Sequence, residues 1–355
     1  MAYLEDKSFY FVSRAPSLSS ETFSVVNFKG SEGISRTYEF DIKLVTRNAD
    51  IDLDEVLAHP ATLYLRPDNA LPVHGVLANL EQQSEVDGNI FYRARLVPRL
   101  WMLSLYNISE VYLDMTFPQI LEKVLQEGEL AADDYDIRFM RQYRQWSYVC
   151  QYQENHLDFI SRWMEREGVY YFFEQGEEKE KLVITDTRMA HVDLPDEKQV
   201  NYSPPSGMEI SGQKNAVTAF VSRQQPVPKK VTVQDFNYRK SPPGIAGEAV
   251  VSAQGRGEDV KTDDEAREYA GLRAEEILCR KKVYYGESAA AFLRPGFYFD
   301  LERHYREDYN RKYLLTDLNH EGSQAAILLA GVNVDLSQYE EKPYYLNNLE
   351  AIASD

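Results

Sequence analysis

The sequence predicts a mainly β protein of the α+β class, in which two β-rich regions flank an α+β unit. Short aromatic and β-branched runs fill the first hundred residues, capped helix patterns follow, and strand patterns return after residue 216. A chain of 355 residues can form two or three domains. We expect them at 1–106, 107–207 and 208–355, with a loop and a helix inserted at about 238–292.

The first region is typical of a small β-barrel or sandwich. Residues 37–45 alternate strictly, with Tyr38, Phe40 and Ile42 on one face and charged side chains on the other, as in a half-buried strand. Asp87-Gly88 is a hairpin-turn dipeptide. We expect a short helix at 52–57, and strands at 9–12, 23–28, 37–45, 61–66, 73–80 and 91–98.

The middle region carries two helices with sequence-coded ends. Thr116 and Gln119 form a capping box around Pro118, and Gly128 ends that helix. Asn155 caps the second helix and Gly168 ends it. Strands are expected at 169–173 and 181–186, before a loop at 201–207.

The third region returns to strands around one long helix. Strands are expected at 216–221, 230–236, 296–300, 312–320 and 325–332, with a polar loop at 238–261. A capping box at Thr262 begins the helix, whose buried side is expected to hold Ala266, Tyr269, Ala270, Ile277 and Leu278. The first and third regions are alike in type without an alignable repeat, so two similar barrels around an α+β unit remain a hypothesis.

Composition excludes several classes of partner. Asp and Glu total 57 against 39 Lys and Arg, for a net charge of −18, which argues against nucleic acid and anionic membranes. No apolar stretch could span a bilayer, and the first residues lack signal-peptide features, so we expect synthesis in the cytoplasm without a cleaved signal. Cys150 and Cys279 are too few for a disulfide framework or a zinc site, and both are expected to be reduced and packed.

Residues 151–174 resemble a catalytic box, because His156, Asp158, Glu165 and Glu167 surround one predicted helix. Residues two apart on a helix point in different directions, so Glu165 and Glu167 cannot face one substrate as a glycosidase pair. No P-loop, dinucleotide turn, serine-hydrolase elbow or HExxH motif occurs. We expect no catalytic, cofactor or metal site, and keep a cell-wall hydrolase as the alternative of another class.

The aromatic tail at 339–352 has no following element to pack on in the sequence pattern. Aromatic side chains are favoured in buried interfaces. We therefore expect a protein interface at this end of the sequence, formed by Tyr344, Tyr345, Leu346, Leu349 and Ile352.

Several segments resemble VgrG, the spike protein of the type VI secretion system. Val97-Pro98-Arg99-Leu100-Trp101 is similar to a recognisable segment of that family, and residues 149–174, VCQYQENHLDFISRWMEREGVYYFFE, are similar to its most specific block. Val73-His74-Gly75-Val76 and Arg294-Pro295-Gly296 fall where the family has similar turns. The resemblance covers nearly the whole sequence.

The resemblance implies a structural hub without catalysis. Two barrels of the tail-tube type per chain, in a homotrimer, would adapt a threefold spike to the sixfold tube of Hcp protein. The other implied partners are secreted effectors and the OB-type and β-helix spike segment that follows in the family. The implied location is the bacterial cytoplasm during assembly, followed by secretion into the medium or a target cell. A baseplate hub of a contractile phage tail or phage-like injection particle is the alternative within this class.

Overall fold

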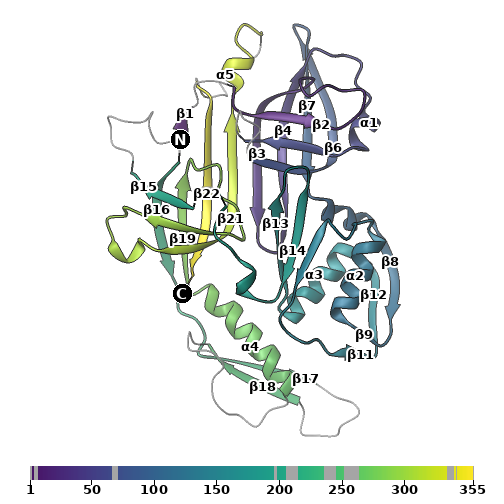
Figure 1. Ribbon diagram of the computed structural model, residues 1–355, viewed down its shortest axis with the longest axis vertical. Helices are drawn as coiled ribbons and strands as arrows, with labels where there is room; N and C mark the ends of the chain where they lie inside the picture. The colour runs from purple at the N-terminus through teal and green to yellow at the C-terminus, as the bar shows by residue number, and fades with distance from the viewer. Residues whose placement is uncertain are drawn as a thin grey trace.

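Two closed barrels of six strands each, with an α+β unit beside them, make up the molecule (Figure 1). This computed structural model describes residues 2–3, 7–65, 71–195, 198–204, 215–235, 245–251, 264–333, 340 and 342–354. The predicted fold class, α+β and mainly β, is confirmed. The domain boundaries stay predictions.

The first barrel is antiparallel throughout and matches the predicted strands. Its ring order is β3-β2-β5-β6-β7-β4, and pairing of β3 with β4 closes it. The elements are β2 (Tyr10–Ser13), β3 (Ser24–Gly33), β4 (Arg36–Thr46), α1 (Leu53–Leu57), β5 (Ala61–Tyr64), β6 (Pro72–Val86) and β7 (Asn89–Val97). Tyr38, Phe40 and Ile42 are fully buried, as their alternation predicts. Asp87 and Gly88, both with positive φ, turn β6 into β7.

The second barrel is formed by strands from the last part of the sequence. Its ring order is β22-β19-β16-β15-β20-β21, and pairing of β21 with β22 closes it. The strands are β15 (Gln199–Tyr202), β16 (Ala216–Gln224), β19 (Lys282–Ser288), β20 (Tyr298–Glu302), β21 (Lys312–Ser323) and β22 (Tyr344–Ala353), and β1 (Ala2–Tyr3) adds to β22. β15 therefore pairs with this barrel, although it precedes the predicted boundary at residue 207.

The two barrels have the same strand order along the chain. If β2 to β7 are matched in sequence with β15, β16, β19, β20, β21 and β22, the same neighbours meet in both rings. Only β15 runs in the opposite direction, because it is parallel to both of its neighbours. β-Bulges recur at matching places, in β3 and β16 and again in β6 and β21. Bulges are structural features that relatives keep, so they support the equivalence.

The middle unit packs two helices against small sheets. Asn155 caps α3 by accepting from the Asp158 amide, and Gly168 ends it in the left-handed conformation, as predicted. Its elements are η1 (Arg99–Leu105), β8 (Asn107–Tyr112), β9 (Met115–Thr116), α2 (Phe117–Glu127), β10 (Tyr135–Arg138), β11 (Gln145–Trp146), β12 (Val149–Asn155), α3 (His156–Glu167), β13 (Tyr170–Gln175), β14 (Glu180–Thr185) and η2 (Arg188–Ala190).

A small ββα insertion leaves the second barrel between β16 and β19 and extends beyond the middle unit (Figure 1). It consists of β17 (Lys230–Asp235), β18 (Ile245–Val250) and α4 (Asp264–Cys279). Of the predicted buried side of α4, Ala266 and Ala270 are buried and the other three residues are half-buried. The capping box at Thr262 and most of the loop at 238–261 lie outside the described residues.

Three predictions in the third region are wrong. β18 lies within the predicted loop, where Gly247 permits contact with α4: a Cβ there would overlap the backbone of Ala266. Lys282–Ser288, predicted as part of the insertion, is barrel strand β19. The predicted strand at 325–332 is the short helix α5 (Ala325–Leu328), since a short buried apolar run fits either structure. No helix in the described part of the chain is long and apolar enough to cross a membrane.

Candidate functional site

The two barrels are joined through a strand pair, here called the seam. Residues 27–33 of β3 pair antiparallel with residues 323–317 of β21, so one sheet continues from barrel to barrel. Gly30 lies opposite His320 at its centre. A side chain on Gly30 would overlap the ring of Phe40, and one on Gly322 would overlap Phe28. Small residues thus let large aromatic side chains pack directly under the seam.

A buried polar network lies on the inner face of the seam. His320 contacts Glu32 through Nε2 at 2.8 Å and the Tyr345 hydroxyl through Nδ1 at 2.7 Å. Arg294 approaches the same Glu32 oxygen at 3.7 Å and donates to the carbonyl of Leu293. His320, Glu32, Arg294 and Tyr345 are each at most 7% exposed. Buried charges require such partners, and this network supplies them from both barrels.

The contacts of His320 fit a neutral ring, which can donate from Nε2 to Glu32 and accept at Nδ1 from the Tyr345 hydroxyl. Burial lowers the pKa of His320, and Glu32 offsets this only in part. Burial alone would raise the pKa of Glu32, but Arg294 and His320 outweigh it and hold that pKa below its ordinary value. The positive charge of Arg294 and the negative charge of Glu32 then cancel. A proton on His320 would therefore add a buried charge that has no partner of opposite sign.

Gln324, fully buried at the end of β21, ties the second barrel to the start of the first. Its Oε1 accepts from the amides of Ser8 and Phe9 at 2.9 and 3.1 Å. Its Nε2 donates to the carbonyls of Phe9 and Val25 at 2.9 and 2.7 Å. One side chain therefore satisfies four buried backbone groups.

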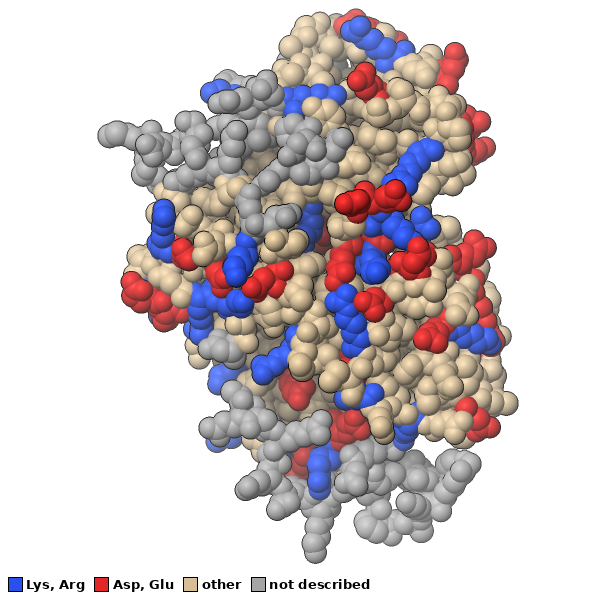
Figure 2. All heavy atoms as spheres, viewed as in Figure 1, with Lys and Arg blue, Asp and Glu red and all other residues tan. Residues whose placement is uncertain are grey.

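The outer face of the seam is charged and exposed. Lys29 and Glu321 lie directly opposite each other, 3.6 Å apart, and Arg36 contacts Asp317 at 2.6 Å. Figure 2 shows basic and acidic side chains intermixed over the viewed face, with no large area of one sign. Exposed pairs of this kind contribute little stability, so the inner network and the backbone ladder carry the connection.

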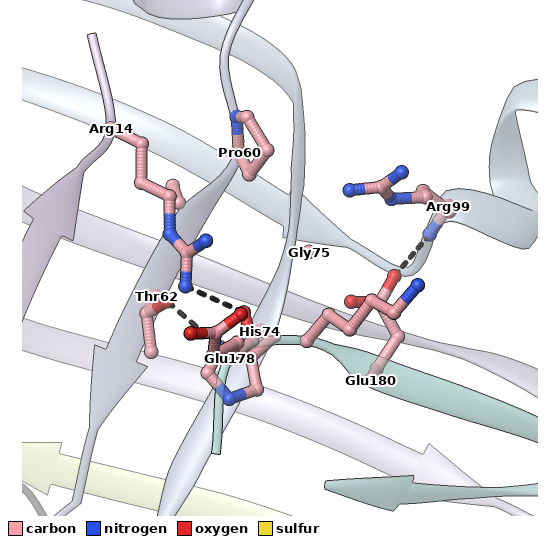
Figure 3. Close-up of a pocket in the computed structure, with 10 residues that line it drawn as sticks. Arg14, Pro60, Thr62, His74, Gly75, Arg99, Glu178 and Glu180 are labelled. Atoms are coloured by element: carbon pink, nitrogen blue, oxygen red, sulfur yellow. Dashed lines mark hydrogen bonds between the residues drawn. The ribbon is translucent and has the colours of Figure 1, made fainter. Parts of the chain in front are cut away.

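A small polar pocket lies where the first barrel meets the β13–β14 hairpin (Figure 3). Its volume of about 70 Å³ has room for a few waters only. Arg14 points to the Glu178 carbonyl, and His74 bridges Thr62 Oγ1 and the Gly176 carbonyl at 3.0 and 2.9 Å. The Arg99 amide donates to buried Glu180, whose pKa burial raises. The pocket joins two units and presents no convergent set of reactive groups.

The residues of the apparent catalytic box are separated and have structural partners. Glu165 is exposed and pairs with Arg273 of α4 at 3.0 Å, whereas Glu167 is buried against Tyr269 and burial raises its pKa. His156 stacks on Tyr106 and contacts Gln151 at 3.2 Å. Asp158 accepts from the Asn155 side chain at 2.7 Å. No cluster of His, Cys, Asp and Glu within the described residues could hold a metal ion.

The predicted interface residues lie on β22, inside the second barrel. The premise that they lack an element to pack on is wrong, because β22 pairs with β1, β19 and β21. Tyr344, Tyr345 and Leu349 are buried within the chain, while Leu346 and Ile352 are half-buried. Their role in an interface stays a prediction. Both cysteines are free, but Cys279 is exposed rather than packed, and Cys150 is half-buried.

Comparisons with known proteins agree with a double-barrel hub. A model of the phage tail baseplate hub (GPD) family matches residues 31–326. The chain belongs to this family. The hub chain is 30% identical over 328 residues to the type VI secretion system spike protein VgrG5 of Pseudomonas aeruginosa, covering 89% of this chain and 41% of that protein.

One further relative and one solved structure are also similar to this chain, the solved structure in its fold. The spike protein VgrG1b of P. aeruginosa is 26% identical over 337 residues, 92% of this chain and 45% of that protein. The E. coli c3393 protein, described as a type VI secretion component similar to phage T4 tail proteins, has a TM-score of 0.71 at 19% identity, covering 97% of this chain and 77% of that one. The hub chain spans less than half of both spike proteins. It is a hub-like structural protein similar to the N-terminal part of VgrG.

The residues that hold the seam were not identified from the sequence. Glu32 alternates with Phe28 and Gly30 along β3, His320 alternates with Leu318 and Gly322 along β21, and Gln324 directly follows β21. A charged or amide side chain on the inward face of a strand is the signal that could have found them, because such a residue needs a buried partner. The partners themselves are nearly 300 residues away, which local pattern does not reveal.

Proposed function

We propose that the chain is the hub of a type VI secretion spike, and that three copies form a ring of six barrels. One observation carries this: the two barrels have the same strand order along the chain and are joined side by side in one sheet. A chain with two equivalent barrels gives six equivalent positions in a trimer, which matches the threefold spike to the sixfold tube.

The tube of Hcp protein is the proposed partner at the ring, and the spike segment and secreted effectors are the proposed partners beyond it. The proposed course begins with assembly in the bacterial cytoplasm and ends with ejection into the medium or a target cell. The phage-tail hub remains the alternative, and the identity to curated type VI spike proteins favours the secretion system over it.

The mass in solution, measured by light scattering, tests the ring. We expect about three times the chain mass of 41.0 kDa. A monomer at working concentration would contradict assembly by this chain itself. A trimeric preparation should also bind hexameric tube protein, and failure to bind would contradict the adaptor function.

Ionic strength tests the electrostatic side of assembly. Each copy carries a net charge of −18, so copies repel at long range. Salt screens this repulsion, since the Debye length falls from about 30 Å at 0.01 M to about 8 Å at 0.15 M. The trimer fraction should rise with salt over this range, and a fraction indifferent to salt would contradict the reasoning.

A further inference from the structure

The two ring nitrogens of His320 contact side chains from different barrels. Glu32 on β3 contacts Nε2, and the hydroxyl of Tyr345 on β22 contacts Nδ1. Asn347 donates to the same hydroxyl at 3.2 Å and to the carbonyl of Ala290 at 2.9 Å, which fixes the orientation of its amide. The hydroxyl proton of Tyr345 is then left for Nδ1. A second proton on the ring would therefore have to displace this hydrogen bond.

The charged groups that face His320 also come from both barrels. Glu32 from β3 and Arg294 from the segment between β19 and β20 supply one charge of each sign. β4 supplies the uncharged ring of Phe40, whose centroid lies 5.2 Å from that of the His320 ring, and β22 supplies neutral Tyr345. Protonation of His320 would thus leave one net positive charge in a site that is closed to water.

We propose that the seam is an acid-sensitive joint, in which protonation of His320 favours separation of β3 from β21 while both barrels stay closed. Each ring is completed by its own strands, since β3 pairs with β4 and β21 pairs with β22. Separation at the seam therefore breaks neither ring, and it lets water reach the charged imidazole. The joint belongs to the single chain and does not depend on the proposed trimer.

The direction of the pH effect follows from the state in which His320 binds a proton more readily. Burial lowers the pKa of His320 in the closed seam, whereas a hydrated histidine has a pKa of about 6.5. The contribution of His320 to the closed state is therefore complete above about pH 6.5 and is lost as the pH falls.

The size of the effect follows from the same linkage. With His320 neutral in the closed seam and free to titrate in the open one, the ratio of open to closed chains rises about 25-fold from pH 7 to pH 5. Glu32 has a lowered pKa in the closed seam, so it acts in the same direction, but mainly at lower pH, near its ordinary pKa of 4.5.

Hydrogen exchange of the full chain, measured by mass spectrometry, tests the joint. The reporters are the amides that residues 27–33 and 317–323 donate to each other, with rates corrected for the intrinsic pH dependence of exchange. Their corrected rates should be about 25-fold higher at pH 5 than at pH 7. Residues 92–96 of β7, which pair with β4 and β6, are the internal control and should show no such rise. Corrected seam rates that do not change with pH, or an equal rise in the control, would overturn the joint.

Two histidine variants test the assignment to His320. His320→Gln keeps a donor for Glu32 but does not titrate, so the corrected seam rates should become independent of pH. His191→Gln is the matched control, because His191 is also buried with a lowered pKa but lies outside the seam. This control should keep the 25-fold rise. A His320→Gln chain that keeps the rise, or a His191→Gln chain that loses it, would overturn the assignment.

A reversible lock tests the same joint without altering the histidine, and it decides the question even where His320→Gln fails to fold. The chain carries Lys29→Cys and Glu321→Cys, which lie directly opposite each other on the outer face of the seam, with Cys150→Ser and Cys279→Ser. Opposite residues of a ladder have Cα atoms about 4.5–5.5 Å apart, within disulfide range. Oxidation should abolish the acid-dependent rise in seam exchange, and reduction should restore it. An oxidised chain that shows the same rise as the reduced chain would overturn the proposal.

Discussion

Gln324→Leu is the sharpest test of how the barrels are held together. Leucine has nearly the same volume but makes none of the four hydrogen bonds to Ser8, Phe9 and Val25. A buried backbone group left without a partner costs about 1–3 kcal/mol. Even at the low end of that range, the variant should lose about 4 kcal/mol. The entropy of unfolding is about 2.1 cal/mol/K per residue, and the chain has 355 residues. If the chain melts as one unit, the loss should therefore lower the melting temperature by about 5 °C.

Differential scanning calorimetry at neutral pH measures this change. The matched control is Gln126→Leu, since Gln126 is exposed on α2 and its loss should change stability by less than about 0.5 kcal/mol. If Gln324→Leu melts within 1 °C of the parent chain, the barrels do not depend on this side chain, and the reasoning from unsatisfied backbone groups is refuted.

Three further predictions concern the middle unit and α4. Gly168→Ala should lower the free energy of unfolding by about 1–2 kcal/mol in thermal melting, because φ is 64° and the new Cβ would meet α4. The control is Gly271→Ala, in open space on a helix, which should be neutral or stabilising by up to about 1 kcal/mol. Burial lowers the pKa of His191, so its contribution to the free energy of unfolding is complete above pH 6.5 and is lost as the pH falls. His191→Gln should therefore flatten the fall in melting temperature between pH 7 and 5. An unchanged slope would contradict this. Glu165→Gln should change stability by less than about 0.5 kcal/mol, because the ion pair of Glu165 with Arg273 is exposed. Neither the parent chain nor this variant should hydrolyse glycans.

Local patterns in the sequence predict local structure well. The alternation from Tyr38 to Leu44 and the caps Asn155 and Gly168 each specify their element within a few residues, and the structure confirms them. The prediction of a strand at 325–332 was wrong because its apolar residues fit a strand or a helix equally well. In the structure, Ala325 and Leu329 pack in one cluster with Val26 and Phe91, and this packing stabilises the helix.

Pairing between distant residues could not be predicted. Neither the contact of Glu32 with His320 nor the closure of either ring has a local signature. The equivalence of the barrels escaped a search for sequence repeats because it lies in strand order and bulge position, not in side-chain identity. A few apolar residues do coincide in this equivalence, among them Phe28 with Phe220, Val25 with Val217, and Leu77 with Leu315, but scattered matches of this kind do not make a detectable repeat.

The seam also has a consequence for synthesis on the ribosome. The strands of the first barrel lie within residues 10–97, so that barrel can close early, with mostly short-range contacts. The strand that covers the β3 edge comes from residues 312–323. An unpaired strand edge is a template for mispairing. Nascent chains should therefore be most prone to aggregate while translation passes from about residue 100 to about residue 320.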